Sequence, residues 1–134
     1  MASQIAEKED SFLCSDVRDK LFGPMDFSRR DLGALNIMRG RDNGLPDYNT
    51  CRECFNLPKI EKFTDINPAL AAERPDIFTT LENLYGTVDN IDLYVGAMLE
   101  SRDEPGILFR TVIKEQFQRI RDSDRFWFEN LENG

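Results

Sequence analysis

Residues 31–49 read DLGALNIMRGRDNGLPDYN, and the order of residue types in this stretch indicates the architecture of the chain. Leu32, Leu35 and Ile37 lie near one face of a helix. The following RDNGLPDY is dense in turn-forming residues, and Pro46 suits the first turn of another helix. The stretch therefore predicts a helix, a turn and a second helix.

The same helical period recurs along the rest of the chain. It is cleanest in PDIFTTLENLYG, where apolar residues repeat at spacings of three and four between Pro75 and Gly86. Because no segment alternates as a strand does, we predict an all-α fold with long connections in one domain. The expected helices span residues 15–21, within a helical pattern from 5 to 22; 30–40, with Ser28 as a candidate cap; 46–55; 67–73; 75–86; 91–101, capped by Asp89 or Asn90; and 105–128.

The last of these predicted helices is the longest, and Pro105 opens it. Its apolar residues recur at helical spacing, as expected of a helix that packs on a core. The stripe that they form consists of Leu108, Val112, Ile113, Phe117 and Ile120.

Length and composition indicate a single globular domain. The chain has 134 residues, 40% of them hydrophobic and 31% charged, so it can bury a core. Its net charge of −8 argues against a nucleic-acid partner, because binding to phosphates depends on clustered Lys and Arg. The apolar runs fall short of the ~20 residues that span a bilayer, and the first residues lack a signal-peptide pattern. We expect no nucleic acid and no membrane segment in this chain.

The absence of histidine excludes several kinds of catalytic and metal site. A Ser-His-Asp or Cys-His nucleophile and a histidine-ligated metal or haem all require that side chain. Cys51 and Cys54 have the spacing of a zinc knuckle or a redox pair, but Cys14 alone cannot complete a zinc site and a βαβ context is missing. The sequence predicts no catalytic group and no metal ligand.

A cluster of polar and basic residues at the end of the predicted second helix is a candidate binding site. Asn36, Arg39 and Arg41 precede a glycine-containing turn, and planar guanidinium groups suit bidentate binding of a carboxylate or phosphate. The same arginines suit structural ion pairs with Asp42 or Asp47. Residue spacing leaves both interpretations open.

Residues 31–49 resemble the long motif of the animal haem peroxidase family, which includes Asp-Leu, an asparagine, Arg-Gly-Arg-Asp-His-Gly-Leu-Pro and Tyr-Asn. Residues 112–130, VIKEQFQRIRDSDRFWFEN, resemble a later helix of that family, and residues 85–101, YGTVDNIDLYVGAMLES, resemble the segment between the two. MLESRDEPGILF, and Asn43 where the motif has histidine, are most similar to the peroxidase-like domains of the dual oxidases. The resemblance covers nearly the whole chain.

This resemblance implies haem as the cofactor, with this chain on its proximal side. Asn36 matches an asparagine that hydrogen-bonds the proximal histidine, and Arg39 matches an arginine that pairs with a haem propionate. Leu32 and Leu35 match apolar residues that line the same side of the haem. These four residues are therefore the predicted cofactor-binding residues.

The resemblance also implies that residues 1–134 are the C-terminal portion of a larger peroxidase domain. The expected partner is the remainder of that domain, including the proximal and distal histidines, and the expected location is extracellular or at the plasma membrane. Arg41 and Asp42 are interpreted as a pair that locks the turn.

Peroxidases of this family oxidise donors with hydrogen peroxide, a reaction that needs a base and an iron ligand. We therefore expect this chain to have no specific peroxidase activity alone. The alternative is a non-catalytic, peroxidase-derived module that binds a partner.

Overall fold

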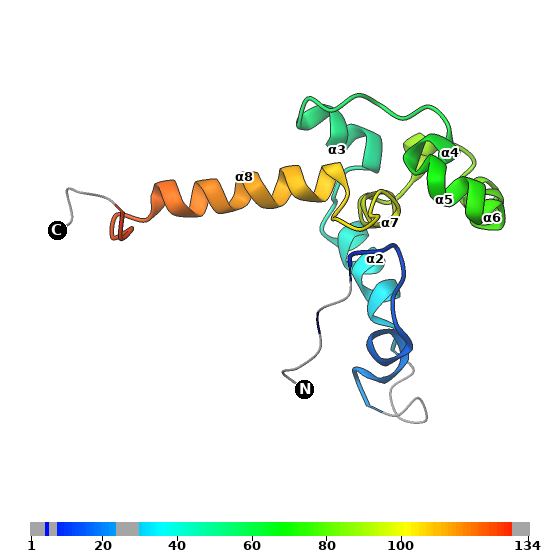
Figure 1. Ribbon diagram of the computed structural model, residues 1–134, viewed down its shortest axis with the longest axis horizontal. Coiled ribbons are helices and arrows are strands. Elements are labelled where there is room, and N and C mark those ends of the chain that lie inside the picture. Colours follow the sequence, from blue (N-terminus) through cyan, green and yellow to red (C-terminus); the bar gives the residue numbers. More distant parts are fainter. Residues whose placement is uncertain (1–4, 6–7, 24–29, 130–134) are drawn as a thin grey trace.

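The computed structural model describes residues 5, 8–23 and 30–129, and Figure 1 shows a chain built from helices. This confirms the all-α prediction: among the described residues, strand-like pairing is limited to isolated bridges such as Glu9 with Asp103. In chain order the elements are the π-helical turn η1 (Asp16–Lys20), α2 (Leu32–Asp42), α3 (Tyr48–Cys54), α4 (Phe63–Ile66), α5 (Pro68–Glu73), α6 (Pro75–Tyr85), the 3₁₀ turn η2 (Val88–Asn90), α7 (Leu93–Leu99) and α8 (Ile107–Ser123).

Several helices occur where the sequence predicts them. α6 runs from Pro75 to Tyr85, and Gly86 follows at a φ of +74°, a left-handed conformation that favours glycine at a helix end. α3 and α5 also lie within their predicted ranges. The sequence did not predict α4, because four residues are too few to show a helical period.

The start of α2 is set by Asp31. Its side-chain oxygen accepts a hydrogen bond from the Ala34 N–H at 3.2 Å, so the helix begins at Leu32, slightly later than predicted. The candidate cap Ser28 lies outside the described residues. An acidic cap at this end also complements the helix dipole.

Two other predicted boundaries are wrong. Asp89 and Asn90 belong to η2 and do not cap α7, whose N-cap position is Asp92. At the other end of the chain, α8 stops at Ser123, so the residues up to 128 are not helical.

The predicted N-terminal helix is present only from Ser15 through η1, and the described residues before Ser15 are not helical. They run instead along the loop that follows α7. The Lys8 ammonium lies 3.1 Å from the Asp103 carboxylate, and the Ser11 hydroxyl donates to the Ser101 carbonyl at 3.0 Å. Tertiary contacts thus outweigh a local helical preference in this segment.

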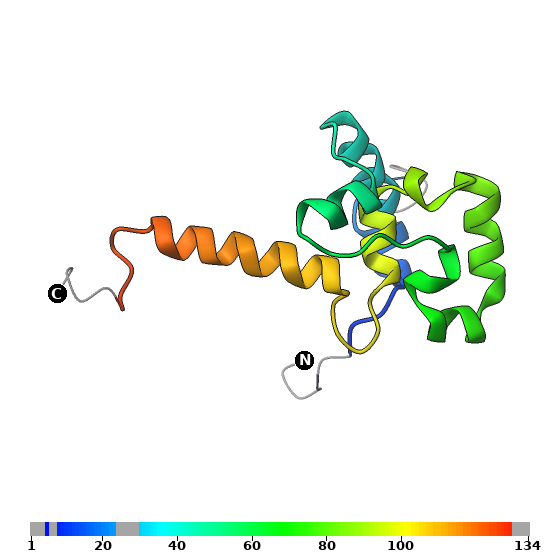
Figure 2. The same cartoon turned by 90° about the horizontal axis from the view of Figure 1, so that it is seen from above.

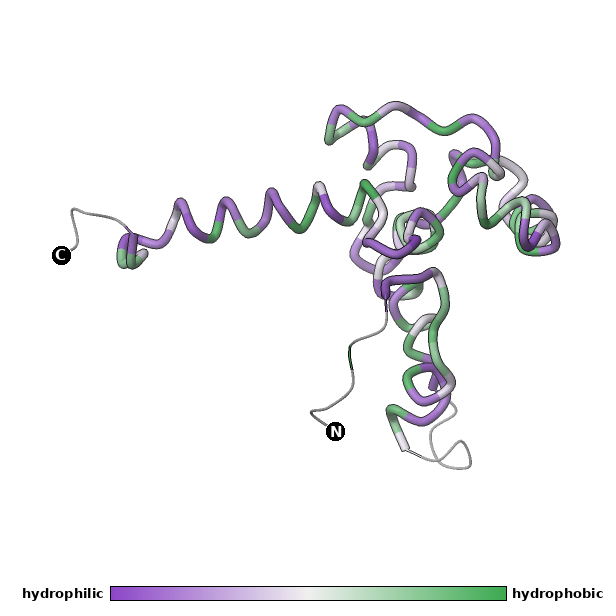
Figure 3. The backbone as a smooth tube through the Cα atoms, in the orientation of Figure 1, coloured by the Kyte–Doolittle hydropathy of each residue, from purple (hydrophilic) through white to green (hydrophobic). Residues whose placement is uncertain are grey.

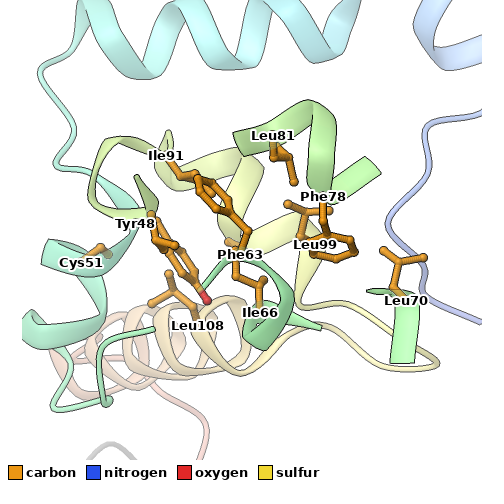
Figure 4. Packing of buried hydrophobic residues seen from close by; sticks show 12 residues of the cluster. Tyr48, Cys51, Phe63, Ile66, Leu70, Phe78, Leu81, Ile91, Leu99 and Leu108 are labelled. Atoms are coloured by element: carbon orange, nitrogen blue, oxygen red, sulfur yellow. The ribbon is translucent and has the colours of Figure 1, made fainter. Parts of the chain in front are cut away.

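The hydrophobic core forms where α3, α7 and the start of α8 meet α4 and α6 (Figure 4). Tyr48, Ile91 and Leu108 are its largest fully buried side chains. Tyr48 packs so closely on α7 that a Cβ at Gly96 would lie 2.4 Å from its ring. The other buried apolar side chains are Cys51, Phe63, Ile66, Leu70, Phe78, Leu81, Val88, Ala97 and Leu99.

A buried charged network joins α3, the end of α7 and the start of α8. Arg52 forms an ion pair with Glu100, and the two side chains are only 6% and 5% exposed. The Tyr48 hydroxyl donates to Glu100 Oε1 at 2.5 Å, and the Leu108 N–H donates to Oε2 at 2.8 Å. Burial and the bond to Glu100 raise the pKa of Tyr48. Because both carboxylate oxygens have partners, this network holds the first turn of α8 against the core.

Beyond its first turns, α8 extends away from the other helices in both views (Figures 1 and 2). Apolar positions recur along its length in Figure 3. Leu108 is buried and Val112 packs on the core, but Phe117 is 67% exposed and Ile120 is exposed as well. The predicted stripe is therefore a core element only at its start. No helix in the described part of the chain is long and apolar enough to cross a membrane.

Candidate functional site

The four predicted cofactor-binding residues share one face of α2. Leu32, Leu35, Asn36 and Arg39 follow the spacing i, i+3, i+4 and i+7, which places them along a single helical stripe. The leucines and Asn36 are half-buried, whereas Arg39 is exposed. This face of α2 therefore changes from apolar to cationic toward its C-terminal end.

Arg39 carries a charge that no described carboxylate neutralises. Its Nη2 donates to the Oδ1 of Asn36, a neutral amide one turn earlier in the helix. No ion pair links Arg39 to an Asp or Glu within residues 5, 8–23 and 30–129. The guanidinium is thus available to an anionic ligand.

The turn after α2 is closed by hydrogen bonds to the last carbonyls of the helix. Asn43 donates to the Arg39 carbonyl from its side chain at 2.8 Å and from its backbone N–H at 3.0 Å. Gly44 then adopts a φ of +65°, and the Leu45 N–H donates to the Gly40 carbonyl at 3.0 Å. Asn43, at the position where the family motif has histidine, therefore acts as a helix cap here.

Asn36 and Arg39 line a pocket of about 470 Å³ between the end of α2, the turn after it, and the starts of α7 and α8. Leu32 and Leu35 do not line it, because they lie further toward the start of α2. The pocket combines aromatic and aliphatic walls with a few polar groups, as small-molecule sites commonly do. Its lining residues are Asn36, Ile37, Arg39, Gly40, Arg41, Asn43, Leu45, Pro46, Asp92, Leu93, Tyr94 and Phe109.

Arg41, the second arginine of the pocket, forms an ion pair with Asp92. The bond is bidentate, with Nε donating to Oδ1 at 2.8 Å and Nη2 donating to Oδ2 at 2.7 Å. The predicted turn-locking pair of Arg41 with Asp42 is therefore wrong. Asp47, the other candidate partner, instead caps α3 by accepting the Thr50 N–H at 2.8 Å.

Asp92 also accepts a hydrogen bond from the Tyr85 hydroxyl, at 2.7 Å to Oδ2. The bond from Arg41 holds the pKa of Asp92 below its ordinary value, although partial burial acts in the opposite direction. Burial, followed by the bond to Asp92, raises the pKa of Tyr85 to about 12. At neutral pH the carboxylate is therefore charged, the phenol is protonated, and the charge of Arg41 is neutralised.

Asp92, Tyr94 and Phe109 line the pocket although they were not predicted as site residues. They lie far from α2 along the chain, so spacing within one helix says nothing about them. The available signal was the family resemblance of residues 85–101 and 98–109, which contain all three residues.

The cysteines are all free, with Cys51 buried in the core and Cys14 and Cys54 exposed. Burial raises the pKa of the Cys51 thiol, so it behaves as a small apolar core residue. Within the part of the chain that the structure describes, no group of three or more His, Cys, Asp or Glu side chains could hold a metal ion.

The residues of this site fit the edge of a haem but not its iron. The guanidinium of Arg39 pairs with no carboxylate among the described residues, and its planar shape suits bidentate binding of a ligand carboxylate beside a largely apolar pocket. An axial histidine for the iron cannot come from this chain, because its sequence has none. The fit is therefore to a propionate and to the apolar rim of the ring.

Known proteins match this chain over its whole length. A model of the animal haem peroxidase family matches residues 1–134. The chain is 64% identical over 135 residues to the dual oxidase of Drosophila melanogaster and 47% identical over 135 residues to dual oxidase 1 of Homo sapiens. Each alignment covers all of this chain and only 9% of the relative's length.

A solved structure has a similar fold. Peroxidase A from Dictyostelium discoideum superposes with a TM-score of 0.79 and 37% sequence identity, over 92% of this chain and 24% of that protein's chain. The helices described above are therefore arranged as in part of a peroxidase. Taken with the match over residues 1–134, this means that the chain belongs to the animal haem peroxidase family.

Proposed function

We propose that this chain forms one wall of the haem site in a dual-oxidase-type peroxidase domain, of which residues 1–134 are the C-terminal portion. The observation that carries the proposal is Arg39, a cation with no described carboxylate partner at the edge of a largely apolar pocket. The family match supplies the class of ligand, and the dual oxidase relatives supply the subgroup.

Each of the four predicted residues has a distinct role in this proposal. Arg39 binds a haem propionate, and Asn36 holds the outer nitrogen of a proximal histidine that another part of the domain provides. Leu32 and Leu35 contact the proximal side of the ring and exclude water from it. The haem, when bound, supplies the redox chemistry of peroxide-dependent donor oxidation.

The remainder of the domain is the proposed partner. It provides the proximal and distal histidines, and it covers the apolar stripe that α8 exposes around Phe117 and Ile120. From the resemblance to the dual oxidases we also propose that the whole protein lies outside the cell or at the plasma membrane.

A turnover assay tests the prediction that the chain is inactive alone. Purified chain is mixed with hemin, hydrogen peroxide and a chromogenic donor, and rates are compared with free hemin. We expect no saturable turnover above free hemin, because neither a proton-transferring histidine nor an iron-ligating one is present. Saturable turnover that disappears in Arg39→Ala would overturn this part of the proposal.

A second proposal belongs to a different class, a non-catalytic interaction module derived from a peroxidase. The exposed stripe of α8 favours it, because such a surface suits a partner protein. The module requires that the chain is monodisperse and unfolds in one sharp thermal transition. A broad transition with strong binding of a hydrophobic dye favours the haem-wall proposal, in which other helices normally cover α8.

A further inference from the structure

We propose that Asp92 gives the two arginines of the pocket different roles. Asp92 holds Arg41 in a structural ion pair and leaves Arg39 as the cation that binds the carboxylate of a ligand. This role rests on the haem-wall function proposed above. It makes Asp92 the residue that sets the net charge of the pocket. Asp92 would thereby determine how many carboxylate groups the pocket can bind.

The side chain of Arg41 is already bound to a carboxylate of the chain itself. Two of its nitrogens, Nε and Nη2, donate to the two oxygens of Asp92 at 2.8 and 2.7 Å. The same carboxylate accepts the Tyr85 hydroxyl at 2.7 Å, which holds it in place from the side of α6. A ligand carboxylate would have to displace Asp92 in order to form a bidentate bond with the same edge of Arg41.

Arg39 differs from Arg41 in its hydrogen-bond partner. Its contact with Asn36 lies within one helix and involves a neutral partner, so the positive charge of Arg39 is not neutralised there. Arg39 and Arg41 nevertheless line the same pocket. The difference between them is therefore the presence of a carboxylate beside Arg41, and not their access to the pocket.

The described lining of the pocket carries a net positive charge. Asp92 is the single acidic residue among its described lining residues, and Arg39 and Arg41 are the two basic ones. With Asp92 ionised, one positive charge remains uncompensated. Replacing Asp92 with Asn leaves two, and it frees the Nε edge of Arg41 to face a ligand.

Fluorescence titration of the full 134-residue chain at low ionic strength tests the inference with two probes of similar shape, 2-naphthoate and the neutral 2-naphthamide. We expect the wild-type chain to bind the carboxylate about three- to tenfold more tightly, as suits one exposed charge-assisted bond. Arg39→Ala should abolish this preference. The double variant Arg39→Ala with Asp92→Asn should restore it, because Arg41 is then free. Met38→Ala, which changes an exposed residue of α2 outside the pocket lining, is the control and should retain the wild-type preference.

The outcomes separate this inference from the function on which it rests. If the wild-type chain prefers the carboxylate and the folded double variant does not, the role of Asp92 is wrong while Arg39 remains a carboxylate-binding residue. If the wild-type chain shows no preference, both ideas are wrong, because Arg39 then binds no carboxylate.

A second measurement does not depend on the folding of a variant. The side-chain Nε–H signals of Arg39 and Arg41 are followed by NMR during titration of the wild-type chain with 2-naphthoate, after through-bond assignment on the wild-type chain itself. The Arg39 signal should shift and the Arg41 signal should stay in place. A shift confined to Arg41 would overturn the inference.

Discussion

Glu100 links three helices through two carboxylate oxygens, and its replacement tests the buried network. Glu100→Gln leaves the charge of Arg52 in the core without a counter-charge. We expect the free energy of unfolding, measured by urea denaturation, to fall by about 3 kcal/mol. The matched control is Glu104→Gln, which removes a carboxylate that pairs with Arg110 on the surface, and it should cost less than about 0.5 kcal/mol. Equal effects of the two changes would show that the network does not stabilise the fold.

Two glycines that both lie in helices should respond in opposite ways to the same substitution. A methyl group at Gly96 would lie 2.4 Å from the ring of the buried Tyr48, so Gly96→Ala should destabilise the fold by about 1–3 kcal/mol. At Gly40 the nearest atom is a Leu45 methyl at 3.6 Å, so Gly40→Ala should be neutral or stabilising by up to ~1 kcal/mol. Thermal denaturation of both variants measures the difference, and a stable Gly96→Ala chain would contradict the packing of α3 on α7.

The ion pair of Asp92 with Arg41 predicts a dependence of stability on pH. The pKa of Asp92 is lower in the folded chain than its ordinary value of about 4, so the unfolded chain takes up a proton more readily. The contribution of Asp92 to the free energy of unfolding is therefore complete above its ordinary pKa. This contribution is lost as the pH falls through the pKa of Asp92 in the folded chain. Wild type should be more stable than Asp92→Asn at pH 7, and the gap should narrow below about pH 4. A gap that does not change with pH would argue against the pair.

At the scale of helices, local patterns predicted the elements whose ends carry strong signals. Pro75 and Gly86 bracket α6, and the spacing of apolar residues between them is helical. The residues before Ser15 had a comparable period but lie along the loop after α7, where Lys8 and Ser11 find partners far away in the sequence. Such contacts cannot be read from a window of residues, because they depend on which segments the fold brings together.

α8 shows the limit of periodicity most clearly. Its stripe predicted burial at all five positions, but only Leu108 lies fully within the core. Periodicity shows that a helix has an apolar face, and not which part of the molecule covers that face. In the proposed haem-wall function, the covering part is the remainder of the peroxidase domain.

The exposed half of α8 should bind hydrophobic dye in the isolated chain. Replacing Phe117 and Ile120 together with Gln should lower the fluorescence of bound anilinonaphthalene sulfonate and change the free energy of unfolding by less than about 0.5 kcal/mol. Leu108→Ala, on the buried end of the same stripe, should instead cost about 3 kcal/mol. Dye binding that is insensitive to the double change would contradict the exposure of this face.

At the scale of the whole molecule, the sequence located one side of the candidate site and missed the other. Asn36 and Arg39 were predicted from a single motif on α2, and both line the pocket. Asp92 and Tyr94, from the segment around the start of α7, complete the pocket through tertiary packing that the motif does not encode. The partner of Arg41 was mispredicted for the same reason, since Asp92 is 51 residues away along the chain.

The chain also covers only part of the proteins that it matches, 9% of the Drosophila dual oxidase and 24% of Dictyostelium peroxidase A. A haem site in the proposed whole domain would draw its histidines from elsewhere, because this chain has none. The role of Arg39 is therefore best tested inside a complete peroxidase domain.

The most direct measurement is haem content in a graft, with this chain replacing the matching segment of Dictyostelium peroxidase A. The two share 37% identity and superpose closely, so the graft is expected to fold. Soret absorbance per mole of protein should show haem in the graft and in its Met38→Ala control, an exposed neighbour on α2. Arg39→Ala should weaken haem binding by roughly tenfold through loss of the propionate bond. A folded Arg39→Ala graft that binds haem as tightly as the unchanged graft would contradict the proposal that this chain forms a haem wall.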